Sequence, residues 1–231
     1  MSSSTTSTLK PIKLYGNWGI NPSKVAILLS ELSVPYTIAP VAITEVKSEP
    51  YVSVNPNGRL PAIEDPNTGI VLWESGAILE YIVERYDTGA KLSFAAGQPA
   101  AWLARQWLHF QASGQGPYYG QAAWFKLFAP EPVPLAVARY AAEVNRVSGV
   151  IDGHLAREAE KQGEAGDGPW FVGGRVSFVD IAFVPWQEVA GQVLTKEEYD
   201  VDKYPHLKAW LQKMLARETV RSTLDKFSPK K

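Results

Sequence analysis

A proline-containing turn offers backbone groups that could bind a ligand. The segment Asn55–Pro61, NPNGRLP, ends in a proline that opens a short apolar run. Because proline has no N–H to offer a sheet ladder, a cis Leu60–Pro61 bond would turn the backbone sharply. The N–H and C=O of Leu60 would then face a ligand instead of a neighbouring strand. The alternative is a trans proline on an edge strand, which fits the same spacing.

Glu74-Ser75 is the second chemical feature, at a predicted junction between a strand and a helix. The serine side chain and the first free N–H groups of the helix form an anion site, and the carboxylate of Glu74 can accept from an ammonium group. Together they match the α-carboxylate and α-amine of an amino acid. The alternative is a simple helix N-cap with a glutamate that the helix dipole favours.

Alternating strand and helix signals position both features within residues 9–88. Asn21-Pro22 indicates a helix N-cap followed by proline at the first helical position, and Pro35 ends this helix. Another helix starts at Ser75. Short apolar runs predict four strands, at Ile12–Tyr15, Tyr36–Ile43, Leu60–Ile63 and Ile70–Trp73. The order β-α-β, then β-β-α, predicts one small α/β layer structure.

The rest of the chain is helical in character. Residues 89–98 lose the periodicity and are rich in small residues, which indicates a linker. Residues 99–223 carry helical patterns, interrupted near Gly114–Pro117, and predict an all-helical bundle. Residues 1–8 are expected to be a disordered tail and residues 224–231 a second tail.

The composition of the 231 residues excludes several functions. Lys and Arg total 23 against 24 Asp and Glu, so no basic excess is available for nucleic acid. The chain has no cysteine, so any thiol must come from a bound small molecule. The three histidines are far apart in sequence, and no metal site is expected. No apolar run approaches the roughly 20 residues of a membrane span, and the start lacks a secretory signal. A cytoplasmic protein is expected.

Several segments, in order along nearly the whole chain, resemble the glutathione S-transferase family. They are LYG…NPSKVAILLSELSVPY, VSVNPNGRLPAIED, WESGAILEYI, FVGGRVSFVDIAFVPW and YPHLKAWL. The block WLHFQASGQGPYYGQAAWF is similar to a fungal branch that includes a nitrogen-catabolite regulator. The resemblance implies a thioredoxin-like α/β domain that binds glutathione over residues 9–88. It also implies an all-α bundle for the electrophile over residues 99–223, and a homodimer with two-fold symmetry.

The resemblance assigns roles in glutathione binding by position. Glu74 and Ser75 match the residues that hold the γ-glutamyl end, and Leu60, before a cis-type Pro61, matches the backbone pair that binds the cysteinyl part. Basic residues often meet the glycine carboxylate at two further positions, here Lys47 and Arg59.

The implied chemistry needs a donor that stabilises the thiolate of glutathione. Lowering the pKa of a thiol from about 8.5 by ~2 units takes ~2.7 kcal/mol, which is the order of one charge-assisted hydrogen bond plus a helix N-terminus. Related enzymes use Tyr, Ser or Cys, but here Gly19 or Ile20 stands where Ser or Cys usually falls. Asn21 is the nearest polar substitute, as a thiol donor or only as a helix cap. Tyr15 and Ser23 are weaker candidates.

The helical domain is expected to hold an apolar second substrate. Aromatic residues after Gly116-Pro117 could line a cleft or pack the core, and the pocket candidates are Tyr118, Tyr119, Trp124 and Phe128. One of the two adjacent tyrosines is expected to point inward and the other outward. Ser177 and Asp180 match the family's S-x-x-D capping box, which is structural.

The leading hypothesis is a glutathione-dependent transferase whose activated thiol attacks an apolar electrophile. One alternative is a glutathione-dependent isomerase or tailoring enzyme of secondary metabolism, in which the thiol adds reversibly to a conjugated double bond. The other is a non-catalytic regulatory protein that binds glutathione, which the missing Ser or Cys favours.

Overall fold

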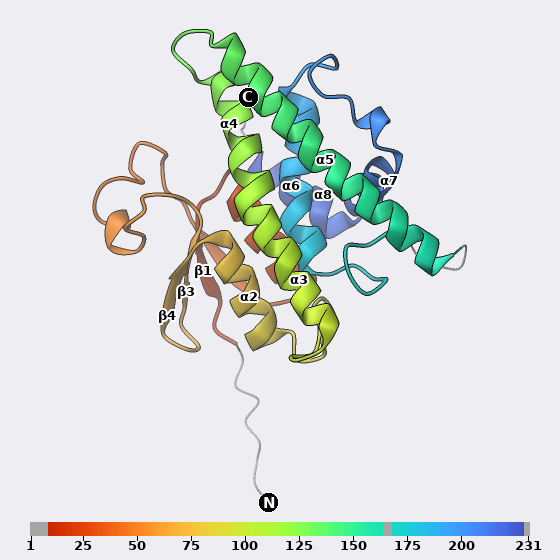
Figure 1. Cartoon of the computed structure of the whole chain (residues 1–231). Helices are drawn as coiled ribbons and strands as arrows, with labels where there is room; N and C mark the ends of the chain where they lie inside the picture. The colour runs from red at the N-terminus through yellow and green to blue at the C-terminus, as the bar shows by residue number, and fades with distance from the viewer. Residues whose placement is uncertain (1–8, 164–167, 229–231) are drawn as a thin grey trace, which may run out of the picture. The chain divides into compact units, whose positions relative to one another are not determined.

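The structure is a computed structural model, and it describes residues 9–163 and 168–228. The chain forms two compact units (Figure 1). Of the described residues, the first unit comprises 9–86 and 223–228, and the second comprises 87–163 and 168–222. The tail predicted at residues 1–8 lies outside the described residues.

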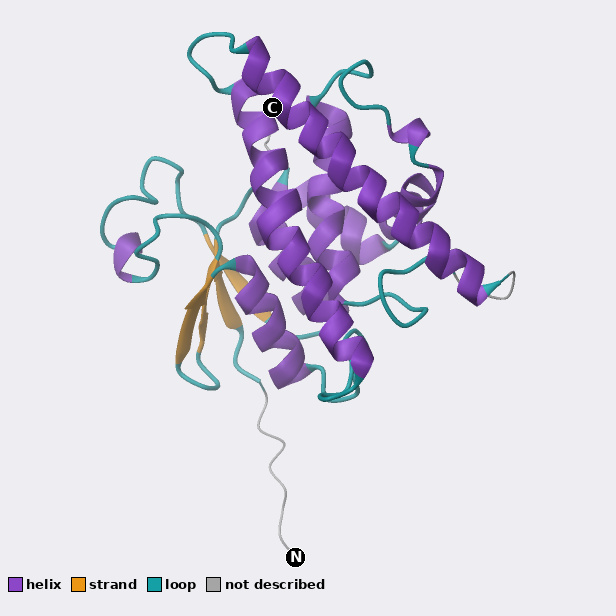
Figure 2. Ribbon diagram, in the orientation of Figure 1, coloured by secondary structure: helices purple, strands orange, loops and turns teal. Residues whose placement is uncertain are grey.

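The first unit is built on a four-stranded mixed sheet (Figure 2). The strands lie in the order β2-β1-β3-β4. Strand β1 is parallel to β2 and antiparallel to β3, and β3 is antiparallel to β4. Their bounds are β1 Ile12–Tyr15, β2 Tyr36–Ala39, β3 Ala62–Asp65 and β4 Ile70–Trp73. This arrangement confirms the predicted thioredoxin-like α/β class.

Two of the predicted strands have different bounds in the structure. Strand β2 ends at Ala39 instead of Ile43, and β3 begins at Ala62 instead of Leu60. In each case a proline lies at the changed end, Pro40 after β2 and Pro61 before β3. Because proline cannot donate a ladder hydrogen bond, both prolines limit the strand beside them.

Helices α1 (Ile20–Glu31) and α2 (Ser75–Tyr86) pack against each other and against the sheet. The predicted start of α1 is wrong: Gly19 is the N-cap, with φ 99° and no side-chain cap, so Asn21 and Pro22 lie inside the first helical turn. Pro22 is tolerated there because the first N–H groups of a helix have no intrahelical acceptor.

The opposite face of the sheet is covered by the segment between β2 and β3. Side chains alternate between the faces of a strand, so Tyr15 and Ala62 point away from the buried Ile12 and Leu14. They pack in a small apolar cluster with Tyr51, which opens the 3-10 turn η1 (Tyr51–Ser53). The turn Asn55–Gly58 leads from this cluster to Leu60 and Pro61.

The second unit is helical, as predicted. Between α3 and α4 a π-helical turn, η2, occupies the predicted interruption, where Pro117 lacks an N–H for the regular ladder. The helices are α3 Pro99–Phe110, η2 Gln111–Gln115, α4 Gly116–Leu127, α5 Pro134–Gln162, α6 Phe178–Val193, η3 Val201–Lys203, α7 Pro205–Leu215 and α8 Glu218–Phe227. The last of these, α8, begins in the second unit, but its residues from Thr223 onward belong to the first unit. It extends into the predicted tail and buries Val220, Thr223 and Phe227.

Residues 89–98, predicted as a linker, are hydrogen-bonded to the helical unit. The carboxylate of Asp87 accepts from the backbone N–H groups of Lys91, Leu92 and Ser93 at 2.7–2.8 Å. The guanidinium of Arg175 donates to the carbonyl oxygens of Ala90, Lys91 and Ser93. This segment is therefore held in place although it has no regular secondary structure. None of the described helices is both long and apolar enough to span a membrane.

Candidate functional site

The sheet register brings the two features singled out from the sequence to one end of the first unit. Ala62, the first residue of β3, pairs with Tyr15 on one side and with Trp73 on the other. Along the chain, Leu60 lies two residues before Ala62, and Glu74 comes directly after Trp73. The start of α1 follows Tyr15 at the same end. The candidate site is the group of residues that leave the sheet here.

Leu60 presents its backbone at this end of the sheet. The Leu60–Pro61 peptide bond is cis, as predicted. The preceding carbonyl, that of Arg59, accepts from the hydroxyl of Tyr51 at 2.7 Å and from the amide of Asn55 at 2.6 Å. Neither the N–H nor the C=O of the half-buried Leu60 bonds to another described residue. The turn is therefore fixed while one peptide donor and one acceptor remain for a ligand.

Glu74 occupies a strained position between β4 and α2. Its φ is 71°, in the left-handed region that residues with a side chain rarely adopt. The exposed carboxylate lies 3.5 Å from the amide nitrogen of Asn57, and Ser75 begins α2. Backbone strain of this kind is concentrated at functional sites. The geometry thus sets a carboxylate beside the N-terminus of a helix, where an anion is also stabilised.

Lys24 is a charged residue of this region that sequence reasoning missed. It lies in α1 with an exposed fraction of 1%. Burial lowers the pKa of its ammonium group to about 7, and the nearby charge of Glu74 opposes that shift. The signal was available, because Lys24 interrupts a helix whose next five residues are all apolar or small, VAILL. Glu74 therefore interacts with a buried base as well as with Asn57.

The start of α1 lies close to Leu60. A Cβ at Gly16, whose φ is 107°, would lie 3.1 Å from the side chain of Pro22 and 3.3 Å from that of Leu60, so a side chain there would be both strained and crowded. Asn21 is half-buried in the first turn of the helix. Because Gly19 is the N-cap, the alternative role of Asn21 as the cap is not supported.

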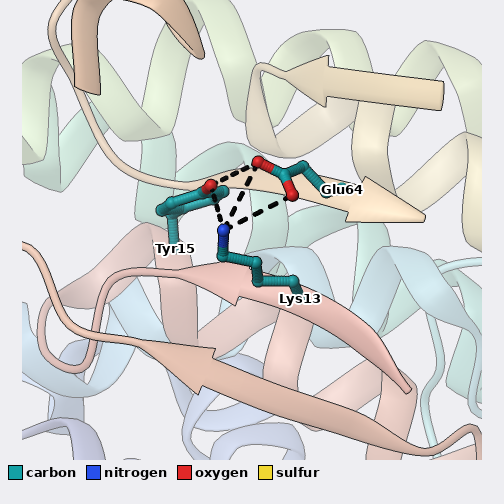
Figure 3. A network of polar contacts seen from close by, with 3 residues as sticks. All are labelled: Lys13, Tyr15 and Glu64. Atoms are coloured by element: carbon teal, nitrogen blue, oxygen red, sulfur yellow. Dashed lines mark hydrogen bonds and ion pairs between the residues drawn. The ribbon is translucent and has the colours of Figure 1, made fainter. Parts of the chain in front are cut away.

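The two weaker candidates for the thiol donor have other partners. The hydroxyl of Tyr15 donates to the carboxylate of Glu64 and accepts from the ammonium of Lys13, as Figure 3 shows. Burial, followed by the hydrogen bond to Glu64, raises the pKa of Tyr15 above its ordinary value. The hydroxyl of Ser23 donates to the carbonyl oxygen of Ile20 at 2.7 Å and is buried.

The two basic candidates lie on the segment that precedes β3. Both Lys47 and Arg59 are exposed. Gly58 packs closely against Lys47, since a Cβ at Gly58 would lie 3.2 Å from the Lys47 side chain and 2.9 Å from the carbonyl of Val46. Lys47 and the turn before Leu60 are therefore neighbours. Arg59 is anchored through its carbonyl oxygen, which leaves its side chain in solvent.

The aromatic candidates of the second unit separate into two groups. Tyr119 is buried and bonds to Ser148 and Gln187, so it is the inward member of the tyrosine pair and has a structural role in the bundle. Tyr118 is half-buried. Trp124 and Phe128 are 44% and 69% exposed. These last three remain available for contact with an apolar molecule.

The predicted capping box is confirmed. The N–H and hydroxyl of Ser177 donate to Asp180 at 2.8 and 2.9 Å, and the indole of Trp210 donates to the same carboxylate at 2.9 Å. Asp180 is fully buried and fastens α6 to α7. Among residues 9–163 and 168–228, no group of three or more potential ligand side chains is placed to hold a metal ion.

Two family models match the chain in the order of the two units. Residues 10–84 match the glutathione S-transferase N-terminal domain, and residues 117–218 match the C-terminal domain. The glutathione S-transferase-like protein gedE of Aspergillus terreus is 55% identical over 96% of this chain and 98% of its own length. Glutathione S-transferase 2 of Schizosaccharomyces pombe is 36% identical over 92% and 94%.

Solved structures show the same fold with glutathione derivatives bound. The glutathione transferase URE2P8 from Phanerochaete chrysosporium, with oxidized glutathione, has a TM-score of 0.84 and 37% identity over 96% of each chain. Ure2p in complex with glutathione has a TM-score of 0.85 and 34% identity over 94% of this chain and 95% of that one. With both domain models matched and similarity over nearly its whole length, the chain belongs to the glutathione S-transferase family, among fungal relatives that include the Ure2 type.

Proposed function

We propose that this protein is a glutathione-dependent transferase that activates the glutathione thiol for attack on an apolar electrophile. The single observation that carries the proposal is that three features lie together at one end of the sheet. They are the open backbone of Leu60, the Glu74-Ser75 junction and the first turn of α1. These groups fit a peptide whose amino-acid end carries both an ammonium and a carboxylate. Structures of relatives with glutathione support the same ligand.

Each group would have a distinct task. The N–H and C=O of Leu60 would pair with the cysteinyl peptide unit, as strands pair in a sheet. Glu74 would accept from the γ-glutamyl ammonium, while Ser75 and the N-terminus of α2 would bind its carboxylate. Lys47 and Arg59 are the proposed contacts of the glycine carboxylate. This peptide would direct the thiol toward the first turn of α1.

Asn21 is the proposed partner of the thiol. Its amide N–H would donate to the thiolate, and the N-terminus of α1 would add a favourable dipole. The exposed Trp124 and Phe128 and the half-buried Tyr118 are the proposed contacts of the electrophile. We also propose that the protein is a homodimer and that it is located in the cytoplasm.

A second candidate is a protein that binds glutathione without activating it. The observation that favours it is that Gly19 and Ile20 stand where a hydroxyl or thiol donor is expected. Without such a donor, only the neutral amide of Asn21 would stabilise the thiolate. Glutathione would then still bind, but the pKa of its thiol would change little.

The two candidates separate in a titration of bound glutathione. The ultraviolet absorbance of the thiolate is followed against pH in the wild type, in Asn21→Ala and in the control Asn17→Ala, which changes an exposed asparagine of the same turn. The proposal expects a wild-type thiol pKa well below the free value, a higher value in Asn21→Ala and no change in Asn17→Ala. Binding with no pKa shift in the wild type would favour the non-catalytic candidate.

A further inference from the structure

The last helix of the chain ends at the turn that carries the proposed thiol partner. Helix α8 ends at Phe227, and its residues from Thr223 onward belong to the first unit. The backbone N–H of Gly19 donates to the carbonyl oxygen of Phe227 at 2.9 Å. Asn21 lies two residues after Gly19, in the first turn of α1. The end of α8 is therefore hydrogen-bonded to the residue from which this turn begins.

Gly19 has a backbone conformation that depends on its surroundings. Its φ of 99° and ψ of 162° lie in a region that is almost confined to glycine and persists only where neighbouring contacts hold it. Its carbonyl oxygen accepts the first hydrogen bond of α1, from the N–H of Ser23 at 3.3 Å. Because glycine has no side chain with which to cap the helix, the bond from its N–H to Phe227 orients the residue from outside α1.

Phe227 offers an acceptor whose position is fixed by packing. The last four carbonyl groups of a helix have no intrahelical donor, and the carbonyl of Phe227 is the last one in α8. Thr223 and Phe227 lie four residues apart on one face of the helix, and both are buried. These buried side chains hold the last turn of α8, so its carbonyl oxygen meets Gly19 at a defined place.

The bond to Phe227 also decides which groups remain for the thiol. Gly19 or Ile20 stands where a hydroxyl or thiol donor is expected. The backbone N–H of Gly19 could replace such a donor, but it is already bonded to Phe227. The thiol then depends on Asn21 and the first turn of α1. Because a hydrogen bond weakens steeply when donor and acceptor are misaligned, the orientation of this turn matters for the thiolate.

We propose that the C-terminal end of α8 is a positioning element of the thiol site, and that Phe227 holds Gly19, and with it Asn21, through its carbonyl oxygen. The inference rests on the proposed function, because it concerns how the proposed thiol partner is held. Phe227 acts through Gly19 and is therefore a positioning residue. Residues that the sequence indicated to be a tail would thus take part in activating glutathione.

Ser228→Pro tests this bond without removing a buried side chain. Proline disfavours the helical conformation of the residue before it, so the substitution turns the carbonyl oxygen of Phe227 away while the ring is kept. Ser228→Ala is the matched control, because it keeps the N–H that donates to Leu224 at 2.9 Å. Ser228 is exposed, so both variants should fold.

The pKa of the thiol of bound glutathione is the main readout. It should rise by about 0.5–1 in Ser228→Pro, as expected when one hydrogen bond to the thiolate is weakened, and keep the wild-type value in Ser228→Ala. Phe227→Ala should raise it as well, whereas Phe227→Leu, which keeps an apolar side chain, should restore the wild-type value. A lowered thiol pKa that is the same in the wild type and in Ser228→Pro would overturn the proposal.

Calorimetry with S-hexylglutathione distinguishes positioning of the thiol partner from general damage to the site. This probe keeps the peptide groups of glutathione but has no free thiol. Its affinity should stay within about twofold of the wild-type value in Ser228→Pro and in Ser228→Ala. A loss of more than about tenfold in Ser228→Pro would show that α8 supports the whole glutathione site, and would refute a specific role at the thiol.

Hydrogen exchange of the Gly19 N–H, followed by nuclear magnetic resonance, needs no glutathione. Exchange should be slow in the wild type and in Ser228→Ala, and at least about tenfold faster in Ser228→Pro. Unchanged exchange in Ser228→Pro would overturn the proposal even if the wild-type thiol is activated. A wild-type thiol with its free pKa would instead refute the proposed function and the role of α8 in activation. Faster exchange in Ser228→Pro would still confirm that α8 fastens the turn, so the two failures give different results.

Discussion

Inside the helical unit, the hydroxyl of Tyr119 lies within 3.3 Å of Val144, Ser148 and Gln187, whereas at the end of the sheet the peptide groups of Leu60 bond to no described residue. The two regions also differ in strain, since Glu74 at the sheet end holds a φ of 71°. Buried polar groups with a full set of partners stabilise a fold. Polar groups left open at a rigid edge are available to a ligand. The comparison predicts that mutations in the first region act on stability alone, whereas those at the end of the sheet change ligand binding or relieve strain and buried charge.

The largest effect on stability is expected from Asp180→Ala. The buried carboxylate accepts from Ser177 and Trp210 and is 3.3 Å from the N–H of Phe171. Its removal leaves several buried donors without a partner, and the free energy of unfolding should fall by about 3–5 kcal/mol. Urea unfolding measures this. A midpoint close to that of the wild type would show that the box does not hold the bundle together.

Lys24→Met should show a pH dependence that reports the buried charge at the sheet end. The folded-state pKa of Lys24 is lowered to about 7, so between pH 7 and the ordinary lysine range the unfolded chain binds more protons than the folded one. The burial of Lys24 therefore costs less stability as the pH rises across that window. Its contribution to the free energy of unfolding of the wild type increases by up to about 1.4 kcal/mol per pH unit.

The stability gained by Lys24→Met should accordingly be greatest below pH 7 and shrink toward pH 10. Unfolding in urea at a series of pH values measures it. Lys10→Met, at an exposed lysine of the same unit, is the control and should change the unfolding free energy little. A stability difference between Lys24→Met and the wild type that is the same at every pH would contradict the buried-charge interpretation.

Two substitutions at Glu74 separate binding from strain. Both Glu74→Ala and Glu74→Gly remove the carboxylate, and each should weaken glutathione by about tenfold or more, measured by calorimetry. Only Glu74→Gly relieves the positive φ, so it should also raise the free energy of unfolding by about 1 kcal/mol relative to Glu74→Ala. Unchanged affinity in both variants would remove the amino-acid site.

Much of this organisation was predictable because it rests on local rules. The bounds of β1 and β4 follow from short apolar runs, and the capping box follows from the spacing of Ser177 and Asp180. The start of α1 was not predictable, because it depends on a positive φ at Gly19 that the sequence does not display. Tertiary packing determines which individual side chains are buried and which of them meet at the site.

Packing buries Lys24 although lysines are mostly exposed, and only the apolar run that follows it in the sequence indicated this. It also determined which of the adjacent Tyr118 and Tyr119 faces the interior. Among the candidate site residues, the sequence could point to Leu60, Glu74 and Asn21 by position. It could not show that Asn57 and Lys24 act on Glu74, since that depends on how the turn and α1 meet.

A pair of tyrosine substitutions tests whether Tyr119 belongs to the structural side of the comparison. Tyr119→Phe removes a buried hydroxyl and leaves Ser148 and Gln187 with one partner fewer, so the free energy of unfolding should fall by about 1–2 kcal/mol. Tyr118→Phe, one residue earlier and half-buried, should cost less than about 0.5 kcal/mol. If Tyr119→Phe instead left stability unchanged and altered the turnover of apolar electrophiles, Tyr119 would line the second-substrate pocket after all. The polar interior of the bundle would then serve binding as the end of the sheet does.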